Sequence, residues 1–352
     1  MMRAPVPVIA QDVQEILARD LPWHELDGAT VLVTGANGML PSYALHTLLG
    51  LNDTRDAGLH VIGLVRDEAK ARRILGSTVD RPDFQLLATD VSRLADVDGP
   101  LDMVIHGASA ARPTLHASDP VSTIKANTLG SFNLLDLAVA KRTRRFVLMS
   151  SSEVYGAQPD DVRLIPEHSY GGFDILLPRA SYSEGKRAAE TIASVYAAQH
   201  GIDARIVRFG HVYGPGMALD DGRVQADFAA NVVRGENIVL NSDGRAMRTY
   251  TYVADAVAGM FVATLVGTER AYNVADPDGM VSIRDLAQHF AQARPEKHLE
   301  RVFTHAEHAE ERSYNTSKFL GLDSSRLEAL GWRPSVDLDT GIDRMLRSFE
   351  EA

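Results

Sequence analysis

A tyrosine and a lysine four residues apart, Tyr182 and Lys186, offer the clearest chemistry in the sequence. The residues that follow, 188–198, are good helix formers, and positions four apart share one face of a helix. An ammonium beside a phenol favours the phenolate, so the pair predicts a lowered pKa for Tyr182 and a general base near neutral pH. The alternative is that two surface residues happen to have this spacing.

A glycine-rich turn earlier in the chain predicts a dinucleotide-binding loop. The buried-strand pattern of residues 30–34 leads to Gly35 and Gly38, and an apolar helix is predicted over residues 43–51. Gly35 permits the tight turn, and Gly38 lets a pyrophosphate approach the backbone and the helix N-terminus. Pro41 replaces the usual third glycine and is sterically acceptable in a first helical turn. An ordinary turn between strand and helix is the alternative.

Strand and helix patterns continue to alternate beyond this loop. Further strand patterns cover residues 60–65, 84–87, 103–108 and 145–149, and Asn127 lies in a helical stretch that runs on to Ala140. This alternation predicts an α/β fold with a doubly wound parallel sheet. Ligands of such sheets bind at the carboxyl ends of the strands.

Two such strand ends carry polar residues. Arg66 and Asp67 follow the second strand, where an acid binds the ribose 2′-hydroxyl of NAD and an arginine holds the 2′-phosphate of NADP. Because Arg66 comes first it favours NADP, but Asp67 leaves NAD open. The run from Ser150 to Glu153 follows a later strand, so it is expected at the ligand site, although a polar turn is the alternative.

Composition predicts an acidic, soluble globular protein. The 352 residues, 45% of them hydrophobic, are sufficient for a large core. A net charge of −11 without a basic run argues against nucleic-acid binding. The absence of cysteine excludes disulfides and thiolate metal sites, no metal site is predicted, and a cytoplasmic location is expected.

The N-terminal 29 residues precede the strand–helix pattern. The spacing of Val13, Ile16 and Leu17 predicts an extra helix packed on the outside of the domain. Residues 1–10 contain one arginine and no long apolar core, so no signal peptide is expected there. No uninterrupted apolar stretch of ~18 residues occurs, so no membrane span is expected.

Together, these residues resemble the extended short-chain dehydrogenases/reductases of the nucleotide-sugar epimerase, dehydratase and decarboxylase group. The resemblance runs from Thr30 onward and is strongest to the UDP-glucuronate decarboxylases over residues 167–255. Its motifs are the glycine loop, His106-Gly107-Ala108, Ser151, the run Ser-Glu-Val-Tyr-Gly at 152–156, Tyr182 with Glu184-Gly185-Lys186-Arg187, Asp221-Gly222-Arg223-Val224, and Arg248 ahead of Tyr252.

The resemblance implies a Rossmann domain over residues 30–210, a substrate lobe mostly within 211–352, and a homodimer. It implies a tightly bound NAD(P) and a nucleotide-sugar substrate. The cofactor residues would be Gly35, Asn37, Gly38, Met39, Arg66, Asp90, Val91, Gly107, Ala108, Asn127, Tyr182 and Lys186. The substrate residues would be Ser152, Arg179, His211, Arg223 and Arg248, with the arginines suited to phosphate.

The resemblance also implies catalytic roles. Tyr182 would take the proton of the sugar 4-hydroxyl during oxidation at C4, Lys186 would hold the nicotinamide ribose, and Ser151 would bind the reacting oxygen. An acid at Glu153 occurs in decarboxylases and in 4,6-dehydratases, whereas 4-epimerases generally lack it. Dehydratases of the dTDP-glucose type place an aspartate just before this acid as proton donor, whereas this chain has Ser152. Decarboxylation of a UDP-uronic acid such as UDP-glucuronate is therefore favoured, with dehydration or epimerisation as alternatives. A sensor that binds NAD(P) without catalysis is an alternative of another class.

Two departures from the family pattern bear on the sugar. The Arg-x-Pro-Asp stretch that supplies an arginine to the sugar is not present before Leu330-Gly331-Trp332, and the nearest cations are Arg312 and Lys318. His211 stands where the family has an asparagine before Tyr-Gly-Pro. A changed contact at this place suggests a changed sugar.

Overall fold

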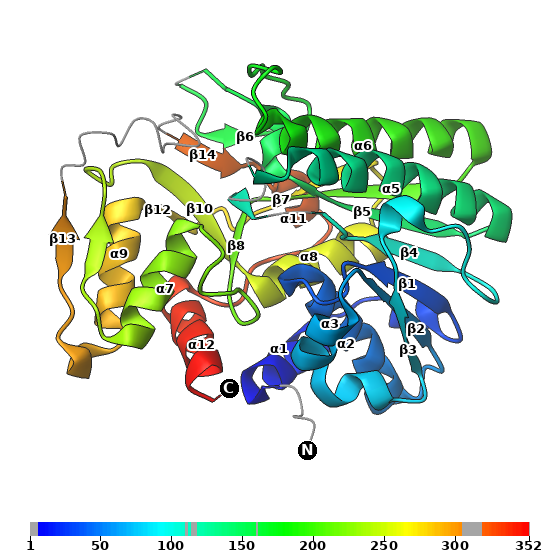
Figure 1. Ribbon diagram of the computed structural model, residues 1–352, viewed down its shortest axis with the longest axis horizontal. Helices are drawn as coiled ribbons and strands as arrows, with labels where there is room; N and C mark the ends of the chain where they lie inside the picture. Colours follow the sequence, from blue (N-terminus) through cyan, green and yellow to red (C-terminus); the bar gives the residue numbers. More distant parts are fainter. Residues whose placement is uncertain (1–5, 110–111, 114–117, 160, 305–318, 352) are drawn as a thin grey trace.

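Seven parallel strands form the centre of the protein: β1 (Thr30–Thr34), β2 (His60–Val65), β3 (Phe84–Ala88), β4 (Met103–His106), β5 (Arg145–Ser151), β7 (Asp203–Phe209) and β11 (Ala271–Val274). Their order across the sheet is β11-β7-β5-β4-β1-β2-β3 (Figure 1). The computed structural model describes residues 6–109, 112–113, 118–159, 161–304 and 319–351. The strand order turns back beside β1, which confirms the predicted doubly wound sheet.

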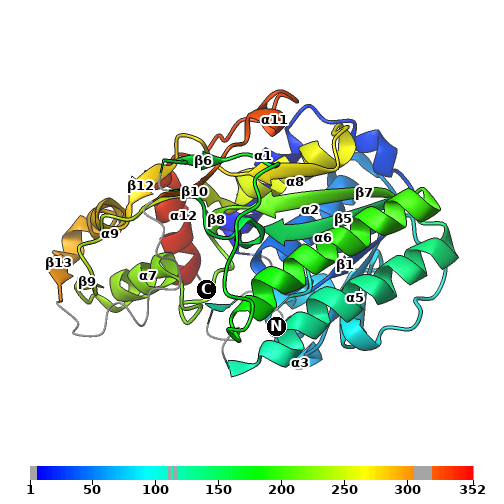
Figure 2. The same ribbon diagram turned by 90° about the horizontal axis from the view of Figure 1, so that it is seen from above.

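Helices cover both faces of this sheet because successive strand residues point to opposite sides. Leu32, Val104 and Phe146 pack against α5 (Pro120–Lys141) and α6 (Ala180–His200), which lie side by side in Figure 2. Val31 and Val33 face the opposite core, which includes α2 (Met39–Arg55), α3 (Glu68–Leu75) and α8 (Val253–Leu265). None of the helices in the described ranges is long and apolar enough to span a bilayer.

A second lobe lies beside the carboxyl ends of the main strands (Figure 1). Its larger sheet contains β6 (Leu164–Ile165), β8 (His211–Tyr213), β10 (Met247–Tyr252), β12 (Met280–Ser282) and β14 (Phe319–Leu322). Its other elements are α7 (Val224–Arg234), α9 (Ile283–Gln292), α12 (Leu338–Glu350) and the strand pair β9 (Ile238–Leu240) and β13 (Arg301–Phe303). The chain crosses between lobes repeatedly: β6 comes before residue 211, whereas β11, α8 and α11 (Ser325–Glu328) come after it.

The predicted N-terminal helix, α1 (Pro7–Leu17), is more than an external addition. Its Asp12 is fully buried and accepts hydrogen bonds from the hydroxyls of Tyr43 on α2 and Tyr252 on β10, each at 2.7 Å. Arg344 on α12 binds the other Asp12 oxygen at 2.7 Å and also pairs with Glu15. Burial raises the pKa of Asp12, while these donors oppose that shift. The helix therefore ties the Rossmann layers to the second lobe.

Replacing Asp12 by alanine should lower the free energy of unfolding by about 2–5 kcal/mol, because two buried hydroxyls lose their acceptor and Arg344 keeps only Glu15. Urea denaturation followed by circular dichroism measures the change. Gln11→Ala on the exposed side of α1 is the control and should stay within about 0.5 kcal/mol of the unsubstituted protein. Equal stability of the two variants would contradict a role for Asp12 in joining the lobes.

Candidate active site

The predicted dinucleotide loop follows β1 and ends at the N-terminus of α2. Gly35 has a φ of +68°, and a Cβ at this position would lie 2.9 Å from the Ala108 Cα, so a side chain here is excluded. Gly38 precedes the helix, which begins at Met39, four residues earlier than the predicted Tyr43. Pro41 permits this early start because a proline needs no intrahelical hydrogen bond in the first turn.

The surroundings of this loop fit a pyrophosphate. The first turn of α2 has no side-chain cap, so its backbone N–H groups are directed toward the loop. Asn37 and Met39 are half-buried beside Gly38. A Cβ on Gly107 would lie 2.6 Å from the Pro41 ring. The residue that follows β4 must therefore also lack a side chain. Ala108, the small residue that follows, is half-buried and donates its N–H to the Thr34 hydroxyl at 3.0 Å.

At the expected adenosine end, Asp67 and Asp90 each cap the start of a helical segment. Asp67 accepts the Lys70 N–H at 2.9 Å and caps α3. Burial alone would raise the pKa of Asp90, but hydrogen bonds from Ser92 and the charges of Arg66 and Arg93 bring it below the usual value. Val91, the next residue, is buried. Arg66 and Asp67 are both exposed at the end of β2.

The catalytic candidates meet where β5 faces α6. Tyr182 is 8% exposed, and its side chain is hydrogen-bonded to Ser151 at the end of β5. Lys186 is 3% exposed, its Nζ lies 6.0 Å from the centre of the Tyr182 ring, and it donates to the Met149 carbonyl at 2.7 Å. Asn127 on α5 packs against the glycine between them and is buried, with its Oδ1 unpartnered in the described residues. The structure thus gathers the predicted tyrosine, lysine and serine.

The electrostatics of Tyr182 differ from the prediction. Burial raises the pKa of the phenol, and the Ser151 hydrogen bond and the charge of Arg223 only partly offset this effect. Burial also lowers the pKa of Lys186 to about 8, opposed by Glu190. The expected lowering of the phenol pKa by Lys186 is therefore wrong for the protein alone, because the ammonium is directed to a backbone carbonyl and both groups are desolvated.

Glu153 lies next to this catalytic group with two partners from the start of α6. Its Oε2 accepts from the Ser183 hydroxyl at 3.0 Å and is 3.7 Å from the Arg179 guanidinium. Ser152, expected to touch substrate, is half-buried at the beginning of the same short 3-10 turn. Ser183 was not predicted from the sequence, although its place directly after Tyr182 in the first helical turn was a usable signal. The Glu153 carboxylate is thus paired with a cation from the residue that precedes α6.

The second lobe contributes His211, Arg223 and Arg248. Burial and the charges of Arg248 and Arg223 lower the pKa of His211 to about 3, so the imidazole is neutral at pH 7. The charge of Arg223 also acts on Tyr182, which connects this group to the catalytic pair. The buried Arg248 donates to the Met247 carbonyl at 2.7 Å, and its pKa is lowered by burial.

One further residue of this group was missed. Tyr250 is paired with His211 across β8 and β10, with 5.6 Å between ring centres. Its buried hydroxyl has no hydrogen-bond partner among the described residues. A buried unpaired hydroxyl beside an arginine and a neutral histidine is a place where a polar ligand group gains a bond. Tyr250 lies within a run of tyrosines and threonines, which predicts a strand and gives no sign of a ligand contact.

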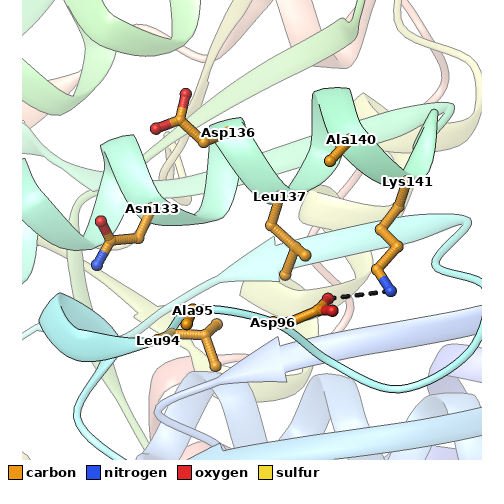
Figure 3. Close-up of a pocket in the computed structure, with 8 residues that line it drawn as sticks. All are labelled: Leu94, Ala95, Asp96, Asn133, Asp136, Leu137, Ala140 and Lys141. Carbon is orange, nitrogen blue, oxygen red and sulfur yellow. Dashed lines mark ion pairs between the residues drawn. The ribbon is translucent and has the colours of Figure 1, made fainter.

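Several observations fall outside this site. Arg312 and Lys318 lie outside the described residues, and Arg326 donates to the Ala271 carbonyl. Residues 94–96 and the second half of α5 line a pocket of about 610 Å³. Figure 3 shows its lining residues, with the Lys141–Asp96 ion pair among them. This pocket lies away from the start of α6, so it is not part of the catalytic group. Over the described segments, no cluster of histidine or acidic side chains is arranged to hold a metal ion.

The chain belongs to the NAD dependent epimerase/dehydratase family, whose model matches residues 31–275. This membership confirms the predicted enzyme class and a nicotinamide dinucleotide cofactor, for which the bare glycine loop is suited. It is 32% identical over 325 residues to UDP-glucuronic acid decarboxylase 6 of Arabidopsis thaliana, covering 91% of this chain and 88% of that protein.

Solved structures with the same fold carry different activities. UDP-glucuronic acid 4-epimerase from Bacillus cereus, in complex with UDP-glucuronic acid and NAD, matches with a TM-score of 0.75 and 22% identity over 92% of this chain and 99% of that one. dTDP-glucose 4,6-dehydratase from Bacillus anthracis, in complex with NAD, matches with a TM-score of 0.72 and 17% identity, covering 92% and 97%. These likenesses support the fold and leave the reaction to be argued from the site.

Proposed function

We propose that the protein oxidises a nucleotide sugar at C4 and releases CO2 from a UDP-uronic acid such as UDP-glucuronate. The position of Glu153 carries this proposal. Its backbone N–H donates to the Ser151 hydroxyl, its charge acts on Tyr182, and its carboxylate is paired with Arg179, so an acid and a cation both flank the expected sugar. The likeness to a UDP-glucuronic acid decarboxylase over 91% of the chain supports the same reaction.

A nicotinamide dinucleotide held along the glycine loop would supply the hydride acceptor for oxidation at C4. Tyr182 would accept the proton of the 4-hydroxyl, and Ser151 would hold the same oxygen through its hydroxyl. With a ketone at C4, the 6-carboxylate becomes a β-keto acid. Its C5–C6 bond then breaks with release of CO2, and the electron pair moves onto the C4 oxygen, where Tyr182 and Ser151 stabilise the enolate charge. A proton handled by Glu153 would then add to C5, and return of the hydride to C4, with the Tyr182 proton to the C4 oxygen, would restore the oxidised dinucleotide.

Charge balance explains the need for Arg179. A substrate carboxylate next to Glu153 would be repelled unless a cation or a proton intervenes. Arg179 is already 3.7 Å from Glu153, at the start of the helix that carries Tyr182. We assign to Arg179 the role that the family gives to an arginine near the C-terminus. Arg223 and Arg248 are then left for the diphosphate, which guanidinium groups bind bidentately.

Mass spectrometry of the products from UDP, dTDP, GDP and CDP sugars tests this function. Loss of CO2 from UDP-glucuronate, with no conversion of neutral hexose nucleotides, is the expected result. Loss of water from a neutral hexose nucleotide would identify a dehydratase instead. An isomeric product of unchanged mass would identify a 4-epimerase, and no conversion of any sugar would favour a catalytically inactive protein.

We further propose that NADP is the bound cofactor. Asp67 is engaged as a helix cap, while the charges of Arg66 and Arg93 converge on Asp90. Arg66→Ala should weaken NADP binding relative to NAD by roughly tenfold to a hundredfold, the size of a lost charged hydrogen bond. Calorimetric titration with both nucleotides, and mass spectrometry of the nucleotide released on denaturation, measure the preference.

Arg73→Ala is the control for this cofactor experiment. It also removes one arginine charge, but Arg73 lies in the last turn of α3, away from the end of β2. It should leave the preference unchanged. Release of NAD alone from the unsubstituted protein would show that Arg66 has no such role.

We also propose that the protein is a homodimer. Exposed apolar side chains follow the outer side of α5 at Val121, Ile124, Leu129 and Phe132, and the Phe132 ring lies 6.2 Å from that of Tyr196 on α6. Phe132→Asp should give a monomer by light scattering, because a charge is costly in an apolar interface. Ile74→Asp, an exposed apolar site on α3, should leave the dimer intact. A monomeric unsubstituted protein would contradict this assembly.

A further inference from the structure

Three consecutive residues at the end of β5 each bond one of three residues spaced four apart on α6. The pairs are Ser151 with Tyr182, Met149 with Lys186, and Ser150 with Glu190. The Ser150 hydroxyl donates to the Glu190 carboxylate at 2.5 Å. Residues at this spacing follow one side of a helix. The strand and the helix are therefore fixed against each other at three successive points, of which only the first two involve the catalytic candidates.

Glu190 is held from its other side by Arg208 on β7. The guanidinium binds the carboxylate at 2.6 Å and 2.9 Å, and both residues are buried. Arg208 is in turn fixed by the Tyr155 hydroxyl at 2.9 Å and the Glu167 carbonyl at 2.7 Å. A buried ion pair is weak support for stability, because well-packed apolar residues often serve as well. The arrangement therefore calls for a reason other than stability.

We propose that Glu190, held by Arg208, is a positioning residue that fixes the rotation and axial position of α6 against β5. A shift of this helix would move the Tyr182 hydroxyl away from Ser151 and the Lys186 ammonium away from Met149. Neither Glu190 nor Arg208 touches the expected substrate. Misplacement of a reacting group by about 1 Å typically costs up to ~10²-fold in rate, so a register device of this kind has a large effect.

Glu190 also provides a negative charge for Lys186. The titratable and charged groups that face this lysine are Tyr182 and Glu190 on its own helix, the buried His106 on β4, and Arg208 beyond the carboxylate. Burial lowers the pKa of Lys186 to about 8, and the Glu190 charge opposes that shift. Turnover that needs the ammonium is present below this pH and is lost above it. Removal of the anion should move that loss to lower pH.

Glu190→Gln in the full-length holoenzyme keeps the shape and removes the charge. With UDP-glucuronate, kcat should fall by roughly 10–100-fold while KM stays within about threefold, and the alkaline limb of the kcat profile should move down by about one pH unit. Tyr155→Phe is the matched control, because it loosens Arg208 from the side away from α6. Its kcat should stay within about threefold of wild type and its alkaline limb unchanged.

Two results would overturn this role. One is a folded Glu190→Gln protein with wild-type kcat and pH profile, and the other is an equal loss in Tyr155→Phe, which would indicate general loosening of the core. If the glutamine variant does not fold, Ser150→Ala tests the register without changing charge and should lower kcat by roughly threefold to tenfold. If wild type leaves UDP-glucuronate unchanged, hydrogen exchange over residues 180–190 replaces turnover, and unchanged protection in Ser150→Ala overturns the proposal.

Discussion

Turnover should fall by about 10²–10⁴-fold when Tyr182 is replaced by phenylalanine, while the dinucleotide stays bound. The substitution removes only the phenolic oxygen, which is hydrogen-bonded to Ser151 and is the general base proposed for the 4-hydroxyl proton. The ring remains in its buried place, so folding and the glycine loop are unaffected. Single-turnover kinetics with UDP-glucuronate and quantitation of the retained nucleotide measure the two effects separately.

Tyr196→Phe is the matched control for this experiment. It removes a hydroxyl from the same helix, but that hydroxyl donates to Asp136 on α5, on the side away from the active site. The control should turn over at the wild-type rate. Activity of Tyr182→Phe within about tenfold of wild type would exclude the phenol as the base.

Glu153→Gln should slow turnover by about 10²-fold or more while UDP-glucuronate still binds. The amide keeps the shape and its contact with Ser183 but cannot exchange a proton near C5, and it leaves Arg179 without its carboxylate. Binding is measured by calorimetry and the product by mass spectrometry. An epimerised product of unchanged mass from the wild type would mean that the substrate carboxylate stays and that Glu153 has another role.

Two controls separate the Glu153 charge from its surroundings. Glu184→Gln removes a half-exposed glutamate paired with Arg187 on the same helix and should be neutral. Ser183→Ala removes one hydrogen bond to Glu153 and should cost roughly threefold to tenfold in turnover. If Glu184→Gln were as harmful as Glu153→Gln, lost negative charge in general would explain the effect.

Local patterns in the sequence were sufficient to predict the sheet and to place Tyr182 and Lys186 on the same helix. Strand patterns, the glycine turn and the spacing of four are all short-range features, and each has a direct structural meaning. These patterns do not show how deeply a given side chain is buried. The pKa of Tyr182 is therefore raised where the neighbouring lysine alone suggested a lowered value. The role of Asp67 as a helix cap could not be predicted either, because an acid after a strand can cap a helix or bind a ribose hydroxyl.

Long-range partners could not be predicted from these patterns. Asp12 lies in an amphipathic stretch, but its partners Tyr252 and Arg344 are 240 and 332 positions away. The bonds of Glu190 to β5 and β7 depend similarly on how helix and sheet are layered. Tyr250 looks like any aromatic strand residue until its unpaired hydroxyl is seen beside His211. Such residues need the fold before their roles become visible.

The buried contact between Asp12 and Arg344 also has a consequence for synthesis on the ribosome. The two residues are 332 positions apart, so at ~5–20 residues per second about 20–70 s separate their translation. The nascent chain must keep α1 without its final partner for that whole period, with the acidic side chain of Asp12 not yet neutralised by the arginine. Helix α1 therefore gains its last partner only after α12 has been made, although its other partners on α2 and β10 are available earlier.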